Sequence, residues 1–174
     1  MHLLKAEQIA NDLKERIATY CVIAAVAGSV RRRKHDVKDI EILCIPVEHE
    51  IESGLFGNFV SQRDRDFVME AMRFGKNVKG DLVKGKYCQF YNEDYGVYID
   101  LFMCSIYNWG YQYMLRTGPR EFSTSMTVKA RHCGIRFKDG YVWDRLGNVL
   151  IVQDEKRLFE LLGIDWIEPS KRER

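Results

Sequence analysis

The sequence lacks the features that mark secreted, zinc-binding or membrane proteins. Its 174 residues include five cysteines, an odd number, and no two of them form a C-x-x-C pair. The cysteines therefore indicate neither a disulfide framework nor a zinc site, and we expect a cytoplasmic location. No apolar run approaches the roughly 20 residues of a membrane span, and no signal-peptide pattern is expected at the N-terminus.

The sequence also lacks an excess of charge of either sign. Lys and Arg number 27 against 25 Asp and Glu, which leaves a formal net charge of only +2. This balance does not mark a generic nucleic-acid binder, so any basic surface must be local. The sequence has no repeat and no proline-rich linker, and its length suits one compact domain or a core unit with a small second lobe.

Helical and strand patterns alternate along the chain. Apolar spacing predicts helices over residues 4–19, 63–75, 108–118, 121–133 and 154–163. Short apolar runs predict strands over 21–27, 40–47, 86–91 and 96–104, with hairpins turning at 92–96 and at 139–140. Residues 48–62, which include Gly54 and Gly57, are expected to form an irregular loop. A lobe boundary is expected near Thr117, where Gly118 and Pro119 end a helix.

Three acidic residues in strand patterns carry the first functional signal. Asp39 and Glu41 are two residues apart, so on a strand their carboxylates point to the same face. Asp100 is alone among apolar neighbours in a second strand, where aspartate is disfavoured. Two adjacent carboxylates repel, and Mg²⁺, which prefers oxygen ligands, is the natural cation to offset that repulsion. Without Asp100, a solvated acidic strand end would be about as good an explanation.

A glycine-serine pair after the first strand adds a second signal. Ser29 is expected to cap a helix whose free N–H groups would hold phosphate oxygens, with an arginine nearby. Arg31 and Arg33 are expected to be solvated or to face DNA. A phosphate site beside a carboxylate cluster suits phosphoryl transfer with two metal ions.

These residues resemble a known family. The segment "GSVRRRKHDVKDIEI" (28–42) is similar to the nucleotidyltransferase motif of the family X (polymerase beta-like) DNA polymerases, with Gly-Ser, an arginine pair and D-x-[DE]. Residues 98–102, "YIDLF", resemble the strand with the third carboxylate, and 116–137 and 155–172 resemble parts of the family's thumb. The resemblance implies an α+β fold in two parts. A nucleotidyltransferase palm over 1–116 would consist of a mixed sheet with helices on one face, and a thumb over 117–174 would consist of helices and a β-hairpin. A palm and thumb alone resemble the minimal form of viral and phage enzymes, which would place the protein in the host cytoplasm.

The resemblance also implies roles for single residues. It places two Mg²⁺ ions, with Mn²⁺ as a substitute, on Asp39, Glu41 and Asp100, and it gives Asp100 a part in deprotonating a primer 3′-hydroxyl. The nucleotide-binding positions that it implies are Gly28, Ser29, Arg32, Lys38, Thr117, Gly118 and Arg120. The family has a cis peptide after this glycine, so the Gly118–Pro119 peptide is predicted to be cis.

Several positions depart from the family pattern. Glu41 replaces an aspartate, Lys38 lies where a glycine often adds phosphate contacts, and Tyr98 replaces an arginine beside the third carboxylate. Ser123 replaces an asparagine near the base. The family's lyase and helix-hairpin-helix regions have no counterpart before residue 20, so DNA is expected to be held by local positive charge. The candidates are Lys76, Lys79, Lys84, Lys86, Lys129, Arg131 and the C-terminal "SKRER".

The sequence thus predicts a DNA-directed DNA polymerase of the polymerase beta type. It would transfer nucleotides from dNTPs to the primer end of primer/template or gapped DNA, as in short-gap repair, and would act as a monomer without a membrane. One alternative is a nucleotidyltransferase with another acceptor, such as tRNA, a protein hydroxyl or a small molecule. Another is a non-catalytic nucleic-acid-binding module.

Overall fold

The protein has an α+β fold. The computed structural model describes residues 1–53 and 58–172, with the backbone alone at 52, 53, 58 and 59. The helices are α1 (Leu3–Ala18), α2 (Gly28–Arg31), α3 (Arg65–Met72), α4 (Trp109–Thr117), α5 (Arg120–His132), α6 (Glu155–Leu161) and the 3₁₀ turn η1 (Pro169–Lys171). The strands are β1 (Cys21–Val26), β2 (Asp39–Pro46), β3 (Glu48–Ser53), β4 (Asn58–Arg63), β5 (Lys76–Gly80), β6 (Tyr87–Asn92), β7 (Val97–Met103), β8 (Arg136–Lys138), β9 (Tyr141–Trp143) and β10 (Val149–Leu150). Within the described part of the chain, no helix combines the length and hydropathy that a membrane span requires.

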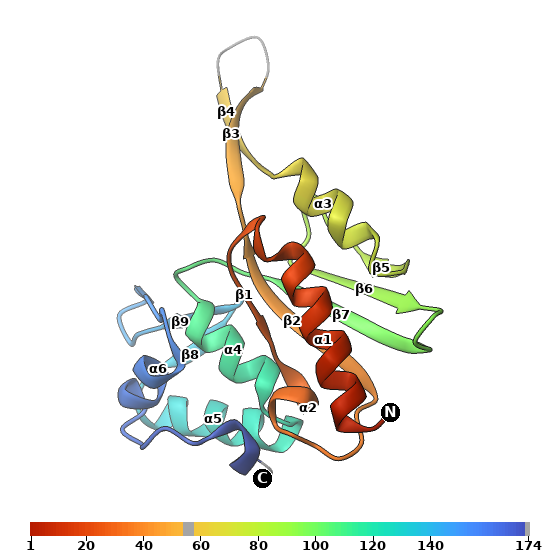
Figure 1. Ribbon diagram of the computed structural model, residues 1–174. Helices are drawn as coiled ribbons and strands as arrows, with labels where there is room; N and C mark the ends of the chain where they lie inside the picture. Colours follow the sequence, from red (N-terminus) through yellow and green to blue (C-terminus); the bar gives the residue numbers. More distant parts are fainter. Residues whose placement is uncertain (54–57, 173–174) are drawn as a thin grey trace.

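A five-stranded sheet in the order β1-β2-β7-β6-β5 forms the centre of the molecule (Figure 1). The central pair β2 and β7 is parallel, and the other pairs are antiparallel, so the sheet is mixed as the sequence predicts. The β6–β7 hairpin forms where the turn residues place it, and β8–β9 forms the second predicted hairpin. β5 and β10 are strands that the sequence patterns do not identify.

Helices α1 and α3 cover one face of the sheet (Figure 1). Five apolar residues of α1 recur at helical spacing and are all buried: Ala6, Ile9, Ala10, Leu13 and Ile17. They pack with Phe67 of α3 and with alternate residues of the sheet, among them Ile40, Ile42 and Ile99. The opposite face of β2 and β7 is therefore the one that receives Asp39, Glu41 and Asp100.

Helix α4 packs on that opposite face, at the end of the strands beyond the acidic residues. Trp109 of α4 is buried against Leu43 and Ile45 of β2 and Phe102 of β7. Helices thus lie on both faces of the sheet, whereas the sequence predicts them on one face only. The difference arises because the apolar side of β2 continues past Glu41 and needs its own cover.

The C-terminal part has its own core. Tyr111 and Met114 of α4 pack there with residues of α5, α6 and β9, among them Phe122, Phe159 and Val142. The lobe boundary at residues 116 and 117 remains a prediction, since α4 contributes apolar residues to this core as well as to the sheet.

Residues 48–53 and 58–63 pair as two strands of a hairpin, so the prediction of an irregular loop is wrong for these residues. β3 pairs with β4 in antiparallel register from Glu48 and Arg63 onward, and the hairpin projects away from the body (Figure 1). Gly54 and Gly57, which suggested the loop, lie outside the described residues. The acidic alternation of β3 hid the strand signal because glutamate is depleted in strands.

Candidate functional site

The three acidic residues lie together on one face of the central parallel pair. In the register of β2 and β7, Glu41 is opposite Asp100 and Asp39 is opposite Tyr98. Residues opposite each other in a ladder share a face, and Asp39 and Glu41 share it by their spacing. All three carboxylates are partly buried. The structure therefore brings together the acids that the sequence analysis selected.

The electrostatics of the two β2 acids reflect this crowding. Burial raises the pKa of Asp39 above its usual value, and the nearby Asp100 raises it further. Burial raises the pKa of Glu41 to about 7, with further increases from Asp39 and Asp100, while Arg116 and Arg32 oppose the shift. The charged forms of these carboxylates are thus destabilised until a cation joins them.

The donor set suits a hard divalent cation, since carboxylate oxygens are the ligands that Mg²⁺ prefers. In their present rotamers the side chains do not converge on one point: across residues 1–53 and 58–172, no group of three His, Cys, Asp or Glu side chains could hold a metal ion. Asp100 is drawn toward β6 by two hydrogen bonds to its Oδ1. Ion binding through all three acids would therefore require rotation of at least one carboxylate.

Two side chains that the sequence analysis missed orient Asp100. The Tyr87 hydroxyl donates a hydrogen bond to Asp100 Oδ1 at 2.6 Å, and Gln89 Nε2 donates one at 2.8 Å. Gln89 is opposite Asp100 in the β6–β7 register, and Tyr87 is two residues away on the same face. The period of two in "YCQFYN" carried this signal, since it places residues 87, 89 and 91 on the face of Asp100.

The turn after β1 lies against the acids. Gly28 has a φ of +62°, and a Cβ built on it would lie 2.4 Å from Glu41 Oε1. The predicted capping role of Ser29 is wrong: Ala27 is the N-cap of the four-residue α2, without a side-chain cap bond. Ser29 lies inside the turn, and its Oγ is buried with no hydrogen-bond partner among the described residues.

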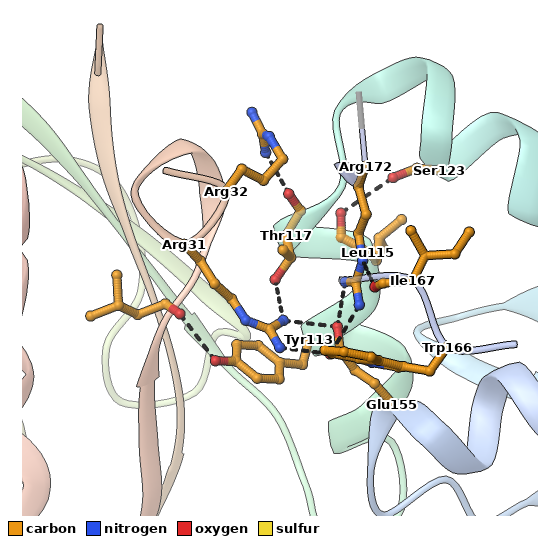
Figure 2. A network of polar contacts seen from close by, with 11 residues as sticks. Arg31, Arg32, Tyr113, Leu115, Thr117, Ser123, Glu155, Trp166, Ile167 and Arg172 are labelled. Atoms are coloured by element: carbon orange, nitrogen blue, oxygen red, sulfur yellow. Dashed lines mark hydrogen bonds and ion pairs between the residues drawn. The ribbon is translucent and has the colours of Figure 1, made fainter. Parts of the chain in front are cut away.

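Arg31, the last residue of α2, and Arg32, its C-cap, connect this turn to the end of α4 (Figure 2). Arg32 Nη1 donates a short hydrogen bond to the carbonyl oxygen of Thr117. Arg31 Nη1 donates to Thr117 Oγ1 at 2.7 Å, and its guanidinium lies 3.5 Å from the centroid of the Tyr113 ring. Two of the predicted nucleotide-binding residues, Arg32 and Thr117, are therefore in direct contact.

Arg31 belongs to a largely buried ion-pair network, which corrects the expectation that it is solvated or faces DNA. Its two terminal nitrogens donate to the two oxygens of Glu155, at 2.8 and 2.6 Å. Arg172 donates to the same carboxylate from the other side, at 2.6 and 3.2 Å (Figure 2). Burial alone would raise the pKa of Glu155, but the hydrogen bonds from both arginines outweigh it and lower this pKa.

The C-terminal basic run is likewise only partly available to DNA. Arg172 is completely buried, so its predicted place in a DNA-binding "SKRER" tail is wrong. Residues 173 and 174 of that run lie outside the described residues. The sequence did not indicate that Arg172 is buried, because a run of basic residues at a chain end is typical of a solvated segment.

The Gly118–Pro119 peptide is trans, contrary to the prediction. Gly118 has φ −70° and ψ 147°, the extended conformation that a residue before proline prefers, and Pro119 acts as the N-cap of α5. The chain thus passes from α4 to α5 without needing the cis form. Arg120, the first residue of α5, is exposed.

Outside the C-terminal run, the predicted DNA-contacting residues are exposed but do not form one cluster. Lys84 and Lys86 lie between β5 and β6, whereas Lys129 and Arg131 lie in the last turn of α5. Lys86 Nζ is 5.5 Å from the ring centroid of Tyr141 in β9, so the lysine reaches toward the C-terminal part. Lys38, just before β2, is exposed as well.

One family comparison bears on these observations. The family model of the DNA polymerase beta thumb matches residues 113–173, from the middle of α4 onward. The match covers about a third of the chain and supports a relationship to the polymerase beta-like proteins. No curated protein matches the sequence.

Proposed function

We propose that the protein is a nucleotidyltransferase of the polymerase beta type, a DNA polymerase that adds nucleotides from dNTPs to a primer 3′-hydroxyl. The observation that carries the proposal is the grouping of Asp39, Glu41 and Asp100 on one sheet face. The Gly28 turn lies against this group, and Arg32 connects the turn to Thr117. Thr117 lies within residues 113–173, the segment that matches the family model of the polymerase beta thumb.

The three carboxylates are proposed to hold two Mg²⁺ ions, or Mn²⁺ in their place. Bound there, the ions would neutralise the triphosphate and the leaving pyrophosphate. The protein's own contribution is to hold Asp100 through Tyr87 and Gln89, so that one oxygen keeps a fixed direction while the carboxylate takes up the hydroxyl proton. The raised pKa of Glu41, about 7, means that the site favours a cation as soon as the acid ionises.

The nucleotide would lie between the α2 turn and the start of α5. Gly28, Ser29, Arg32 and Lys38 are the proposed triphosphate contacts, and the unpartnered Ser29 hydroxyl supports this assignment. Thr117, Gly118 and Arg120 are the proposed contacts for sugar and base, with the exposed guanidinium of Arg120 free to stack on a base. Lys84, Lys86, Lys129 and Arg131 are proposed to contact DNA phosphates.

Two other functions make different demands. A transferase that acts on tRNA, a protein or a small molecule would share the acids and the Gly-Ser turn, and the thumb match favours the polymerase over it. A non-catalytic binding module would not need three acids on one face beside a glycine turn. Short-gap repair, monomeric action and a viral or phage origin remain part of the proposal.

Incorporation onto a labelled primer tests the function. Gapped duplex and single strand are compared, with Mg²⁺ or with chelator, for the wild type, Asp100→Asn and a control, Asp94→Asn, in the exposed β6–β7 turn. We expect templated extension that needs Mg²⁺, survives Asp94→Asn and falls at least a hundredfold in Asp100→Asn. Absence of extension on every nucleic acid, with Mg²⁺-dependent nucleotide binding intact, would direct the search to other acceptors.

A further inference from the structure

The part of the sheet farthest from α4 exposes an unusual set of side chains. β6 alternates partly exposed and buried residues, so Tyr87, Gln89 and Tyr91 share one face, while Cys88 and Phe90 are buried beneath α1 and α3. On β7 the same face carries Tyr98, which is 46% exposed. In Figure 1, α4 and the C-terminal elements lie beside β1 and β2, at the other end of the sheet from β5 and β6.

The strand registers align these residues into a row that crosses the sheet. Asp39 of β2 is opposite Tyr98 of β7, Tyr98 is opposite Tyr91 of β6, and Tyr91 is opposite Lys76 of β5. Three strand spacings separate the carboxylate from the lysine, a distance of about 14 Å. We call Tyr98, Tyr91 and Lys76 the tyrosine row. It begins directly beside the acids and ends at an exposed cation on the sheet edge.

A second row runs parallel to the first. Glu41 is opposite Asp100, Asp100 is opposite Gln89, and Gln89 is opposite Lys79. Lys79 Nζ lies 5.3 Å from the ring centroid of Tyr87. The face is therefore polarised, with carboxylates on the central strands, tyrosines in the middle and lysines at the edge.

The tyrosines are arranged as a platform. The rings of Tyr91 and Tyr98 are in contact, with centroids 5.1 Å apart and planes inclined by 54°. Such a pair also stabilises an antiparallel sheet, but a solvated sheet face is usually polar, and support of the sheet alone does not require lysines at the edge. Aromatic rings beside cations on an open sheet are the arrangement on which proteins stack unpaired bases.

We propose that the tyrosine row binds the unpaired 3′-terminal nucleotides of a nucleic-acid strand. One base stacks on Tyr98 and the next on Tyr91, Lys76 contacts a phosphate, and the 3′ end points toward Asp39 and Asp100. The polarity follows from charge, since phosphates are repelled by the acids and attracted by the edge lysines, whereas a terminal 3′-hydroxyl is neutral. The role of this strand as the acceptor rests on the proposed function, but the binding itself requires no catalysis.

Binding of a 5′-labelled eight-nucleotide single-stranded DNA, followed by fluorescence anisotropy without dNTP, tests the proposal. The variants are Tyr98→Leu, the double variant Tyr91→Leu/Tyr98→Leu and Tyr98→Phe, with Tyr107→Leu as a control at an exposed tyrosine between β7 and α4. We expect Tyr98→Leu to weaken binding about 5- to 10-fold and the double variant about 20-fold or more. Tyr98→Phe, which keeps the ring, and Tyr107→Leu should stay within about twofold.

A second probe tests the polarity of the row. Unlabelled oligonucleotides of the same sequence compete with the labelled probe in chelator: a 3′-phosphate should weaken competition at least threefold, whereas a 5′-phosphate should have no such effect. Equal binding of both phosphorylated probes would overturn the assigned direction. Thermal melting accompanies each variant, and Tyr98→Thr, a good strand former without a ring, replaces Tyr98→Leu if the leucine variant melts early.

The outcomes separate this proposal from the proposed function. Absence of wild-type binding, or binding by the folded double variant within twofold of the wild type at equal salt, would overturn the tyrosine row. If the wild type extends primers but binding does not depend on the tyrosines, the polymerase proposal stands and the tyrosine-row proposal is wrong. If binding depends on the tyrosines but no substrate is extended, the tyrosine-row proposal is supported and the polymerase proposal is wrong.

Discussion

Gly28 shows how one residue without a side chain shapes the acidic site. Its φ of +62° lies in the left-handed region, and the Glu41 carboxylate occupies the space in which a Cβ would stand. Two costs therefore meet at this position, one from the backbone and one from the contact with Glu41. The glycine is what allows the α2 turn and the carboxylate to lie side by side.

The two costs can be separated with a matched pair of substitutions. Gly96 has the same φ of +62°, but a Cβ there would meet nothing within 4 Å. We expect Gly96→Ala to lower the free energy of unfolding by about 1 kcal/mol and Gly28→Ala by about 2 to 4 kcal/mol, because only the latter displaces Glu41. Urea unfolding measures both. Equal losses in the two variants would show that Glu41 does not need the space over Gly28.

The raised pKa of Glu41 predicts that the free energy of unfolding depends on pH in metal-free buffer. Its pKa in the folded protein is raised from the usual 4.5 to about 7, so between these values the folded state holds a proton that the unfolded chain has released. The stability from this proton is fully present below pH 4.5 and is lost as the pH rises through 7. The loss should reach about 2 to 3 kcal/mol.

Urea midpoints in EDTA, from pH 4.5 to 8, measure this loss for the wild type and Glu41→Gln. The glutamine variant should lack this part of the slope and should be more stable than the wild type at pH 8. Addition of Mg²⁺ at pH 8 should stabilise the wild type and have a smaller effect on the variant, since ligand binding to the folded state adds to stability. Parallel pH profiles for both proteins would contradict the burial of an ionising Glu41.

At the scale of elements, the β3–β4 hairpin stands apart from the fold. None of its described residues belongs to the core clusters around the sheet, and its apolar pair Ile51 and Val60 is exposed. It is anchored at its base, where Arg63 Nη1 donates a hydrogen bond to the carbonyl oxygen of Leu82. The hairpin is therefore an attachment to the sheet and not a support of it.

Replacement of residues 49–62 by an Asn-Gly turn tests this view. The turn would join Glu48 and Arg63, which are already cross-strand partners, and Asn-Gly suits a two-residue hairpin loop. We expect the melting temperature to change by less than about 4 °C, equivalent to roughly 1 kcal/mol, and primer extension to be retained. A loss of cooperative unfolding would mean that the hairpin supports the sheet.

Sequence patterns predicted the elements whose side chains have a strong period. α1 and strands β2, β6 and β7 were predictable because their buried faces are continuous, and the spacing of Asp39 and Glu41 was enough to place both on one face. β3 was missed because its alternation is charged, with Glu48 and Glu50 at the polar positions. β5, with Lys76 and Lys79, is exposed throughout and offers no apolar period to read.

The misassigned site residues were those whose environment depends on distant segments. The sequence indicated solvated cations at Arg31 and Arg172, yet both pair with Glu155. Arg31 is 124 residues from Glu155 in the sequence, and Arg172 is 17 residues from it. Likewise, the hydrogen bond from Tyr87 to Asp100 depends on the register of two strands. Such partners are set by tertiary packing, which local spacing does not determine.

At the scale of the whole molecule, Glu155 connects three regions of the chain. Arg31 comes from α2 beside the sheet, Glu155 from α6 in the C-terminal core, and Arg172 from the end of the described chain. Trp166 Nε1 donates a further hydrogen bond to Glu155 at 3.4 Å. The sheet and the C-terminal core, the two halves of the molecule, are thus joined by buried charges in addition to the apolar contact of Trp109 with β2 and β7.

A single substitution tests how much this connection contributes. Arg172→Ala removes a fully buried partner and leaves the Glu155 carboxylate with Arg31 as its remaining cation, a loss that typically costs about 3 to 5 kcal/mol. Lys171→Ala, one residue away, removes an exposed pair with Glu168 and should cost less than about 0.5 kcal/mol. Melting temperatures should therefore fall by roughly 10 °C in the first variant and hardly at all in the second. Similar melting temperatures for both variants would mean that Arg31 alone compensates the charge of Glu155, and that the C-terminal segment is not part of what holds the two halves together.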